Sequence, residues 1–346
     1  MYALAFIVVV GLVVLVHELG HFAAARLAGV RVYEFAVGFG PRLFAKRVGE
    51  TLYAVRALPL GGMCRFAGMD DSDLEGEQVD PDDPASFVNR PFWQRILVVA
   101  AGPLMNFVLA VIILTGLFSV YGVPMAGIVD VLDSSPAQEA GFEVGDTIIS
   151  INGRPVASVA GFVNTVSTSW GRRLDVEIQR DGERHILQVV PEYDAEAGVG
   201  RIGVRLTESP VRSEARGTLG GAIRYTWGVI DTTITSLWAA LSGRAKPEVS
   251  GPLGIAGMSA QAAQQGLPSL LMFIALISTS LGLLNLMPVP VLDGGWIVLL
   301  AVEAIRGKKL SPQVEEALRF VGLALLMLLM VYATVSDISR LIVRDM

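Results

Sequence analysis

Residues 8–25 read VVVGLVVLVHELGHFAAA, a hydrophobic segment that contains an HExxH motif at His17–His21. Residues i and i+4 lie on one face of a helix, about 6 Å apart along its axis. Two imidazoles in this arrangement can bind one Zn²⁺, and Glu18 between them can act as a general base on metal-bound water. Ionisable side chains are costly in a membrane segment and by default mark a functional site. The motif therefore predicts a metal centre inside a membrane helix.

Two simpler interpretations fit this segment less well. In a soluble helix Glu18 would lie on a solvated face, but almost no other polar residue shares the segment. A signal peptide would need a basic residue before its hydrophobic run, and no Lys or Arg precedes this one.

The composition is that of a membrane protein. The 346 residues are 52% hydrophobic and 17% charged, with a mean hydropathy of +0.55, whereas soluble domains contain about 25% charged residues. The net charge of −6 argues against nucleic acid as a partner. The single cysteine, Cys64, excludes an intrachain disulfide framework and a cysteine-based zinc site.

Four segments are long and apolar enough to cross the ~30 Å hydrocarbon core of a bilayer. They cover residues 3–28, 96–120, 267–287 and 314–335. Residues 219–241 are also apolar, but they carry Arg224 and Asp231. Two charges at mid-membrane are costly, so an amphipathic helix at the interface is favoured over a fifth span.

Basic residues predict the orientation of the spans. Residues 31–47, after the first span, and residues 306–309, between the third and fourth, are rich in Lys and Arg. The positive-inside rule places both loops in the cytosol and the N-terminus outside. The HExxH motif then lies in the cytosolic half of its span.

Two polar regions separate the spans. In the first, residues 51–62 favour a strand or hairpin close behind the HExxH helix, with an irregular surface loop as the alternative. Residues 69–85 are rich in Asp and Glu, and such a run of charge predicts a solvated linker. The alternative is an acidic metal-binding loop, but the carboxylates lack the spacing of an EF-hand. The second region, residues 122–208, predicts a small β-rich domain with a short helix outside the cell.

A catalytic zinc site requires a third protein ligand, and Asp293 is the strongest candidate. It follows NLMPVPVL at residues 285–292 and precedes two glycines, a context that stops a regular helix. Broken backbone at membrane depth is tolerated where it lines a cavity. The alternatives are that Asp293 only caps the next helix, or that Glu303 is the ligand.

With these motifs the chain resembles the site-2 protease family of intramembrane zinc metalloproteases, in its bacterial form with one PDZ domain. HExxH and the Asn-x-x-Pro-x-Pro-x-x-Asp-Gly stretch at Asn285–Gly294 match the two motifs that define the family. GFGP at residues 38–41 and GPLMN at residues 102–106 match further family patterns. Residues 127–206 resemble the family's PDZ domain.

The resemblance implies an α-helical polytopic protein of the inner (plasma) membrane. It has about four transmembrane helices, an inserted β-rich PDZ domain on the extracytoplasmic side and a membrane-associated β-hairpin. The expected parts are the first membrane part at residues 1–121, the PDZ domain at 122–208, an interfacial helix and linker at 209–266, and the second membrane part at 267–346.

The resemblance also implies His17, His21 and Asp293 as zinc ligands and Glu18 as the catalytic residue. The activity it implies is regulated intramembrane proteolysis. The substrate would be the membrane-spanning helix of a single-pass regulatory protein, such as an anti-sigma factor, that a site-1-type protease has already trimmed.

Substrate contacts are expected at three further places. A peptide bond in a helix is enclosed, so the substrate must unwind, and the strand near residues 51–58 can hold it by edge addition. Asn106 and Asn285 can bind the substrate backbone or the developing oxyanion, with interhelical hydrogen bonds as the alternative. The PDZ domain either binds a new C-terminus or acts as a size filter.

Two other functions are compatible with parts of the sequence. The first is a non-proteolytic scaffold with a vestigial zinc site, and the intact HExxH motif argues against it. The second is a zinc transporter, which would need several intramembrane ligands along a path, whereas the sequence shows one cluster.

Overall fold

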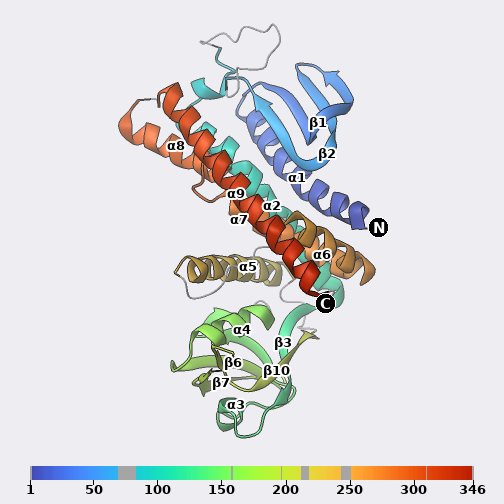
Figure 1. Ribbon diagram of the computed structural model, residues 1–346, viewed down its shortest axis with the longest axis vertical. Helices are drawn as coiled ribbons and strands as arrows, with labels where there is room; N and C mark the ends of the chain where they lie inside the picture. The colour runs from blue at the N-terminus through green and yellow to red at the C-terminus, as the bar shows by residue number, and fades with distance from the viewer. Residues whose placement is uncertain are drawn as a thin grey trace. The chain divides into compact units, whose positions relative to one another are not determined.

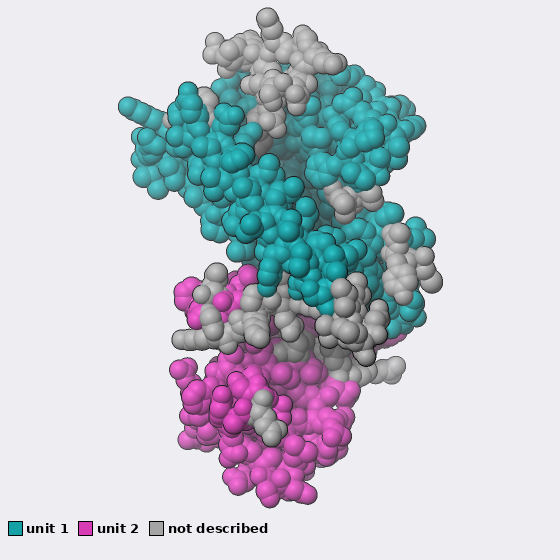
Figure 2. Space-filling view, viewed as in Figure 1, with its two compact units in different colours: residues 1–110, 248–346 teal, residues 111–247 magenta. Residues whose placement is uncertain are grey.

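The computed structural model describes residues 2–68, 83–156, 159–195, 197–211, 218–242, 251–308 and 310–344 (Figure 1). The chain divides into two compact units, which Figure 2 shows in different colours: residues 1–110 with 248–346, and residues 111–247. Most of the acidic linker expected at residues 69–85 lies outside the described residues. The domain boundaries expected from sequence stay predictions.

Four helices are long and apolar enough to cross a membrane: α1 (Tyr2–Leu27), α2 (Phe92–Tyr121), α7 (Leu267–Asn285) and α9 (Pro312–Arg344). Their spanning windows have mean hydropathies between 2.1 and 2.6. A helix satisfies every backbone hydrogen bond within itself, which an apolar segment in lipid requires. The four predicted spans are confirmed. Helix α5 (Thr218–Leu241) is not a candidate span among the described residues.

A bent β-sheet follows α1, formed by β1 (Val32–Val48) and β2 (Thr51–Phe66). Glycines with positive φ, Gly38 (90°) and Gly40 (85°), allow β1 to turn in its middle. As a result its first half pairs with both ends of β2, and Phe35 lies opposite Cys64 on one side and Tyr53 on the other.

This register corrects, at residues 52–55, the expectation that the strand near residues 51–58 offers an edge to a substrate. Residues 52–55 pair with residues 34–37 on one side and with residues 44–47 on the other. Within the part of the chain that the structure describes, residues 62–66 pair on one side only, with the first half of β1. Among the described residues, the end of β2 therefore keeps one edge unpaired, as does the 44–47 segment of β1.

A buried carboxylate stabilises the turn in β1. Glu34 is 3% exposed and accepts hydrogen bonds from Arg56 (2.6 Å) and Arg42 (3.1 Å). Arg56 also donates to the Gly40 carbonyl at 3.0 Å. Burial alone would raise the pKa of Glu34, but the two guanidinium groups outweigh it and lower the pKa below its ordinary value. Glu34 therefore stays ionised and holds both halves of the bent strand together.

Helix α1 contacts several other elements of the first unit. It packs against β2, against α6 (Pro252–Gln264) and against α7. The buried Asp337 of α9 accepts hydrogen bonds from the backbone N–H groups of Gly251 (3.1 Å) and Gly254 (2.8 Å), at the start of α6. A carboxylate at a helix N-terminus satisfies free N–H groups and complements the helix dipole. Asp337 thus attaches α9 to α6.

The second unit contains an antiparallel sheet with the order β10-β3-β4-β6-β7 and β5 beside β4. Helices α3 (Pro136–Glu139) and α4 (Val159–Thr168) accompany it. A buried core that includes Ile148, Phe162 and Val176 joins sheet and helices. The predicted small β-rich domain with a short helix is confirmed. The strands are β3 (Val123–Val131), β4 (Thr147–Ile151), β5 (Arg154–Pro155), β6 (Leu174–Arg180), β7 (Glu183–Val189), β8 (Glu192–Asp194), β9 (Val199–Arg201) and β10 (Val204–Val211).

Candidate metal centre

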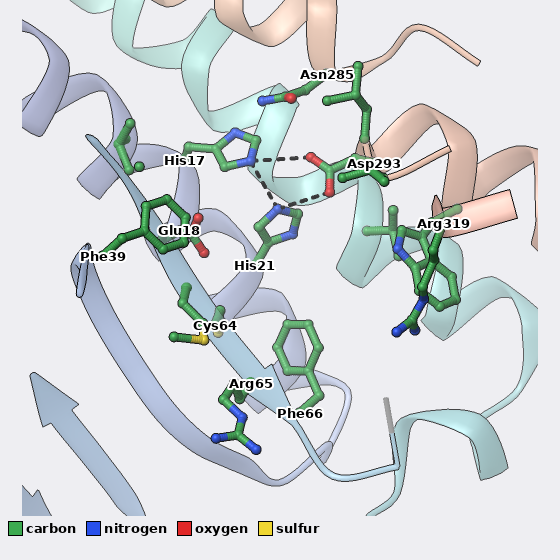
Figure 3. A pocket seen from close by; sticks show the side chains of 18 of the residues that line it. His17, Glu18, His21, Phe39, Cys64, Arg65, Phe66, Asn285, Asp293 and Arg319 are labelled. Atoms are coloured by element: carbon green, nitrogen blue, oxygen red, sulfur yellow. Dashed lines mark hydrogen bonds and ion pairs between the residues drawn. The ribbon is translucent and has the colours of Figure 1, made fainter. Parts of the chain in front are cut away.

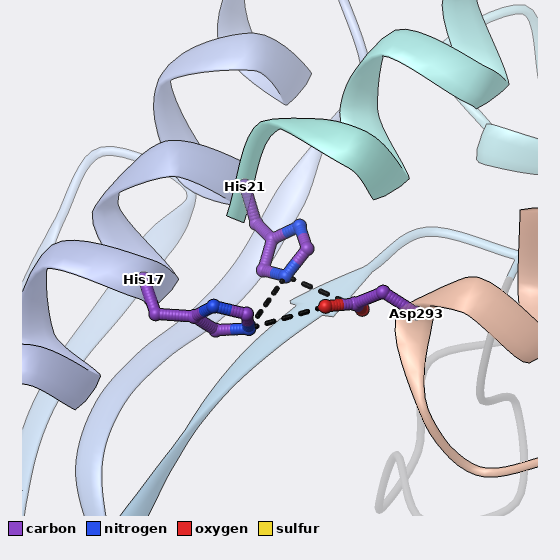
Figure 4. A group of neighbouring side chains, drawn as sticks. All are labelled: His17, His21 and Asp293. Atoms are coloured by element: carbon purple, nitrogen blue, oxygen red, sulfur yellow. Dashed lines mark hydrogen bonds and ion pairs between the residues drawn. The ribbon is translucent and has the colours of Figure 1, made fainter. Parts of the chain in front are cut away.

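The two motif histidines lie side by side on α1. Both are buried, and their Nε2 atoms are 3.2 Å apart (Figure 4). The rings meet edge to face, with centroids 4.8 Å apart. This pairing follows from the i, i+4 spacing alone, because residues one turn apart share a helix face.

Broken backbone after α7 brings Asp293 to the histidines. Residues 286–292 connect α7 to α8 (Asp293–Arg306), and Val291 has φ 87° within this segment. Two glycines let the connection fold tightly: a Cβ on Gly294 would lie 2.3 Å from the Leu286 carbonyl oxygen, and one on Gly295 would lie 2.3 Å from that of Val289. Only glycine permits this close approach.

Asp293 closes a triangle of ligand atoms. Its Oδ2 is 3.2 Å from His17 Nε2, and its Oδ1 is 3.4 Å from His21 Nε2. Ligands at about 2.0–2.1 Å from a tetrahedral zinc ion lie roughly 3.3 Å from one another. The three side chains therefore fit zinc, with a fourth position left for substrate or water. Among the described residues they form the one such group of His, Cys, Asp or Glu.

The two alternatives for the third ligand do not match the structure. Asp293 is the first residue of α8, and Leu292 occupies the N-cap position. Glu303 accepts a hydrogen bond from Arg95 at 3.1 Å and another from the Leu310 backbone N–H at 3.0 Å. Glu303 therefore joins α8 to the start of α2 and stays away from the metal centre.

Helix α2 orients both imidazoles from behind. His21 Nδ1 donates to the Val98 carbonyl at 2.9 Å, and His17 Nδ1 lies 3.2 Å from Asn106 Nδ2. Such contacts fix the ring orientation of a metal ligand, so that Nε2 faces the metal. The helices cross closely here, because a Cβ on Gly20 would lie 2.4 Å from the Ala101 carbonyl oxygen.

Gly102 makes room for the His21 ring, since a Cβ at this position would lie 2.2 Å from His21 Nε2. The added atom would meet a rigid ring at its metal-binding atom. We expect Gly102→Ala to weaken zinc binding roughly 10- to 100-fold, as loss of ligand orientation does in other zinc sites. Zinc competition with a chelator measures this. Gly116→Ala in the same helix is the matched control and should bind zinc normally, because a Cβ there meets no atom of the described residues within 4 Å.

A cavity of about 740 Å³ lies beside the three ligands (Figure 3). Glu18 lines it from α1, and a Cβ on Gly62 would lie 2.4 Å from Glu18 Cγ. The free end of β2, residues 61–66, forms one wall. Residues from α7, α8 and α9 contribute to the rest of the lining: Asn285, Trp296, Glu316, Arg319, Phe320 and Leu323.

Cys64 lines the same cavity but is not suited to chemistry. Burial, with the charge of Glu18 as a smaller cause, raises the pKa of its thiol far above the ordinary value. Among the described residues, Cys64 is also not a member of the group of possible metal ligands. Cys64 therefore serves as a small apolar wall residue.

The two asparagines expected to bind substrate lie in different places. Asn285, at the end of α7, lines the cavity. Asn106 is fully buried behind His17 and is not part of the lining. A fully buried side chain cannot touch a substrate, so the expected substrate contact of Asn106 is replaced by a contact with a metal ligand.

Several residues at the site were not singled out by sequence reasoning for these roles. Val98 acts through a backbone carbonyl, which carries no sequence signal. Gly102 and Phe39 belong to stretches that matched family patterns, but their contacts with His21 and with the cavity depend on tertiary packing. The glycine beside proline in an apolar helix was the one available signal, since glycine costs helix stability unless packing requires it.

The chain matches known proteins along nearly its whole length. A sequence profile described as peptidase family M50 matches residues 5–329. The Regulator of sigma-W protease RasP of Bacillus subtilis is 33% identical over 98% of this chain and 98% of its own length. The zinc metalloprotease RasP of Bacillus licheniformis is 34% identical over 98% and 99%. That of Oceanobacillus iheyensis is 33% identical over 97% and 98%.

A solved structure also matches part of the chain. The PDZ domain of an SdrC-like protein of Listeria monocytogenes covers 24% of this chain and 87% of its own, at 19% identity and a TM-score of 0.23.

Proposed function

The chain belongs to peptidase family M50, the site-2 protease family, and is a zinc metalloprotease; on that premise we propose that it cuts the membrane-spanning segments of membrane-anchored regulatory proteins. The observation that carries this proposal is the placement of the ligand triangle. Two of its members lie on an apolar helix long enough to span, and the cavity beside them contains the carboxylate of Glu18.

His17, His21 and Asp293 hold the metal in this proposal. Zinc, when bound, supplies a Lewis acid that polarises the scissile carbonyl and makes a water molecule more acidic. Glu18 follows His17 in the sequence and lines the same cavity. It accepts the proton of the attacking water and passes it to the leaving amine. Asn285, which lines the same cavity, donates from its amide to the carbonyl oxygen as charge develops there in this proposal.

Substrates are proposed to be single-pass regulatory proteins such as anti-sigma factors, already shortened by a site-1-type protease. The relative in Bacillus subtilis carries the name of a sigma-W regulator, which supports a regulatory substrate here. A purified protein in detergent or liposomes should cleave a single-span model substrate, and a zinc chelator should stop it. If the substrate stays uncut although the protein holds one equivalent of zinc, proteolysis is refuted and a scaffold function is favoured.

An unwound substrate segment has unpaired backbone groups that are costly to leave in a dry cavity. Residues 62–66 pair on one side only and line the cavity beside Glu18 and Gly62. The substrate backbone can add to this edge as a further strand, so binding depends on main-chain hydrogen bonds and tolerates varied side chains. This placement replaces the edge first expected at residues 51–58.

Proline substitutions at residues 62–65 test this edge. At those of residues 62–65 whose backbone N–H points away from β1, proline removes an N–H donor that the substrate could use. The hydrogen bonds between β1 and β2 are kept at these positions. We expect roughly 2- to 10-fold lower kcat/KM for each donor lost, from about 1 kcal/mol per backbone hydrogen bond. Proline at outward positions of residues 44–47, an edge away from the cavity, is the control. Equal effects on both edges, or none on either, would rule out capture by the end of β2.

The proposed orientation places residues 306–309 in the cytosol and the β-rich unit, proposed to be a PDZ domain, outside. In a Cys64→Ala background, Lys308→Cys should resist a membrane-impermeant thiol reagent in intact cells, because the bilayer separates them. Glu183→Cys, on an exposed strand of the β-rich unit, should react. If Lys308→Cys is labelled and Glu183→Cys is not, the orientation is opposite to the one proposed.

A further inference from the structure

Among the described residues, the side chain of Asn106 makes one hydrogen-bond contact, and its partner is His17, a proposed metal ligand. The side chain is fully buried on α2, and its Nδ2 lies 3.2 Å from His17 Nδ1. Among the described residues its Oδ1 has no hydrogen-bond partner. A buried amide oxygen without a donor is costly, and native structures seldom keep one without a reason.

The protonation of His17 supplies that reason. Its Nε2 faces Asp293 Oδ2 at 3.2 Å and is the atom that enters the ligand triangle. An imidazole that binds metal through Nε2 carries its proton on Nδ1, so Nδ1 becomes a donor. Two donors would then face each other across the 3.2 Å contact. Exchanging the amide oxygen and nitrogen of Asn106 removes this repulsion, because the two groups are nearly isosteric.

We propose that Asn106 is a positioning residue, which presents Oδ1 to the Nδ1–H group of His17 and so holds the ring for metal binding through Nε2. The unpartnered oxygen gains a donor, and the ring can neither rotate nor bind metal through the wrong nitrogen. His21 has the equivalent arrangement, since its Nδ1 donates to the Val98 carbonyl. Both acceptors lie on α2, so one helix orients both histidines of another. This inference rests on the proposed role of His17 as a ligand.

Helix α7 fixes the position of Asn106. Ser278 Oγ donates to the Asn106 backbone carbonyl at 2.8 Å. A Cβ on Gly282 would lie 3.2 Å from Asn106 Cβ, so the helices pack closely at this turn. Among the described residues, Ser278 hydrogen-bonds the backbone of Asn106 and makes no hydrogen bond to His17, so it is a matched control for loss of interhelical packing.

Zinc affinity and the spectrum of a cobalt-substituted protein test the proposal without a protease assay. Asn106→Leu keeps the approximate shape and removes the acceptor, and it should weaken zinc binding roughly 10- to 100-fold. Asn106→Asp restores an acceptor and should recover most of this loss, with a shifted cobalt absorption band because an anionic partner makes the imidazole more basic. Ser278→Ala should bind zinc as the wild type does. Circular dichroism in chelator shows that each variant is folded.

Three results would overturn the role of Asn106. The first is wild-type zinc affinity and cobalt spectrum in Asn106→Leu. The second is an equal loss in Ser278→Ala, which would assign the effect to packing between α2 and α7. The third is failure of Asn106→Asp to recover affinity while it remains folded. His17→Ala serves as the reference: if that variant keeps full zinc, the ligand assignment fails and not only the role of Asn106.

Discussion

Glu18→Gln protein is expected to bind zinc as the wild type does and to cleave a membrane substrate roughly 10²- to 10⁴-fold more slowly. Glutamine has nearly the same shape, so it fits the close contact with Gly62. The three ligand atoms do not include any atom of Glu18, so the metal should remain. An amide cannot accept the proton of the attacking water, so the chemical step should fail.

Elemental analysis and a gel-based cleavage assay on the same purified sample measure both properties. Zinc content near one equivalent with cleavage lost assigns the proton transfer to Glu18. Wild-type turnover in this variant would remove Glu18 from the mechanism. Loss of both zinc and cleavage would show that Glu18 supports the metal centre instead of acting on the water.

Asp293→Ala is expected to lose zinc as well as activity. The substitution removes the one anionic ligand and leaves His17 and His21 as the remaining pair. Loss of a contact behind a ligand already costs about 10- to 100-fold in metal affinity, so loss of the ligand itself should cost more. Zinc titration against a chelator of known affinity measures the change.

Glu303→Gln is the control for this experiment, because Glu303 was the competing carboxylate in the sequence. It pairs with Arg95 and should keep wild-type zinc affinity. Full zinc content in Asp293→Ala would mean that the ligand triangle seen here does not hold the metal. Loss of zinc in Glu303→Gln but not in Asp293→Ala would move the third ligand to Glu303.

Features that depend on local spacing could be predicted from the sequence. The two histidines share a helix face because they are one turn apart, and hydrophobic runs of about 20 residues predicted the four spans. Asp293 stood out because an acidic residue in an apolar, helix-breaking stretch is costly unless it has a function. These arguments need only the chain near each residue. The structure confirms the four spans and brings Asp293 to the two histidines, while its role as a ligand stays a proposal.

Tertiary structure alone decided which groups meet across the chain. The sequence could place a strand at residues 51–62 but could not show which segments pair with it. Because β1 turns at Gly38 and Gly40, residues 52–55 of the expected edge are paired on both sides, whereas the described residues 62–66 are paired on one side. The sequence singled out Asn106 but could not show what its side chain contacts. The crossing of α1 and α2 directs that side chain to His17 and not into the cavity. Periodicity determines which face of an element a residue occupies. Sheet register and helix crossing, which depend on contacts between distant segments, determine what that face touches.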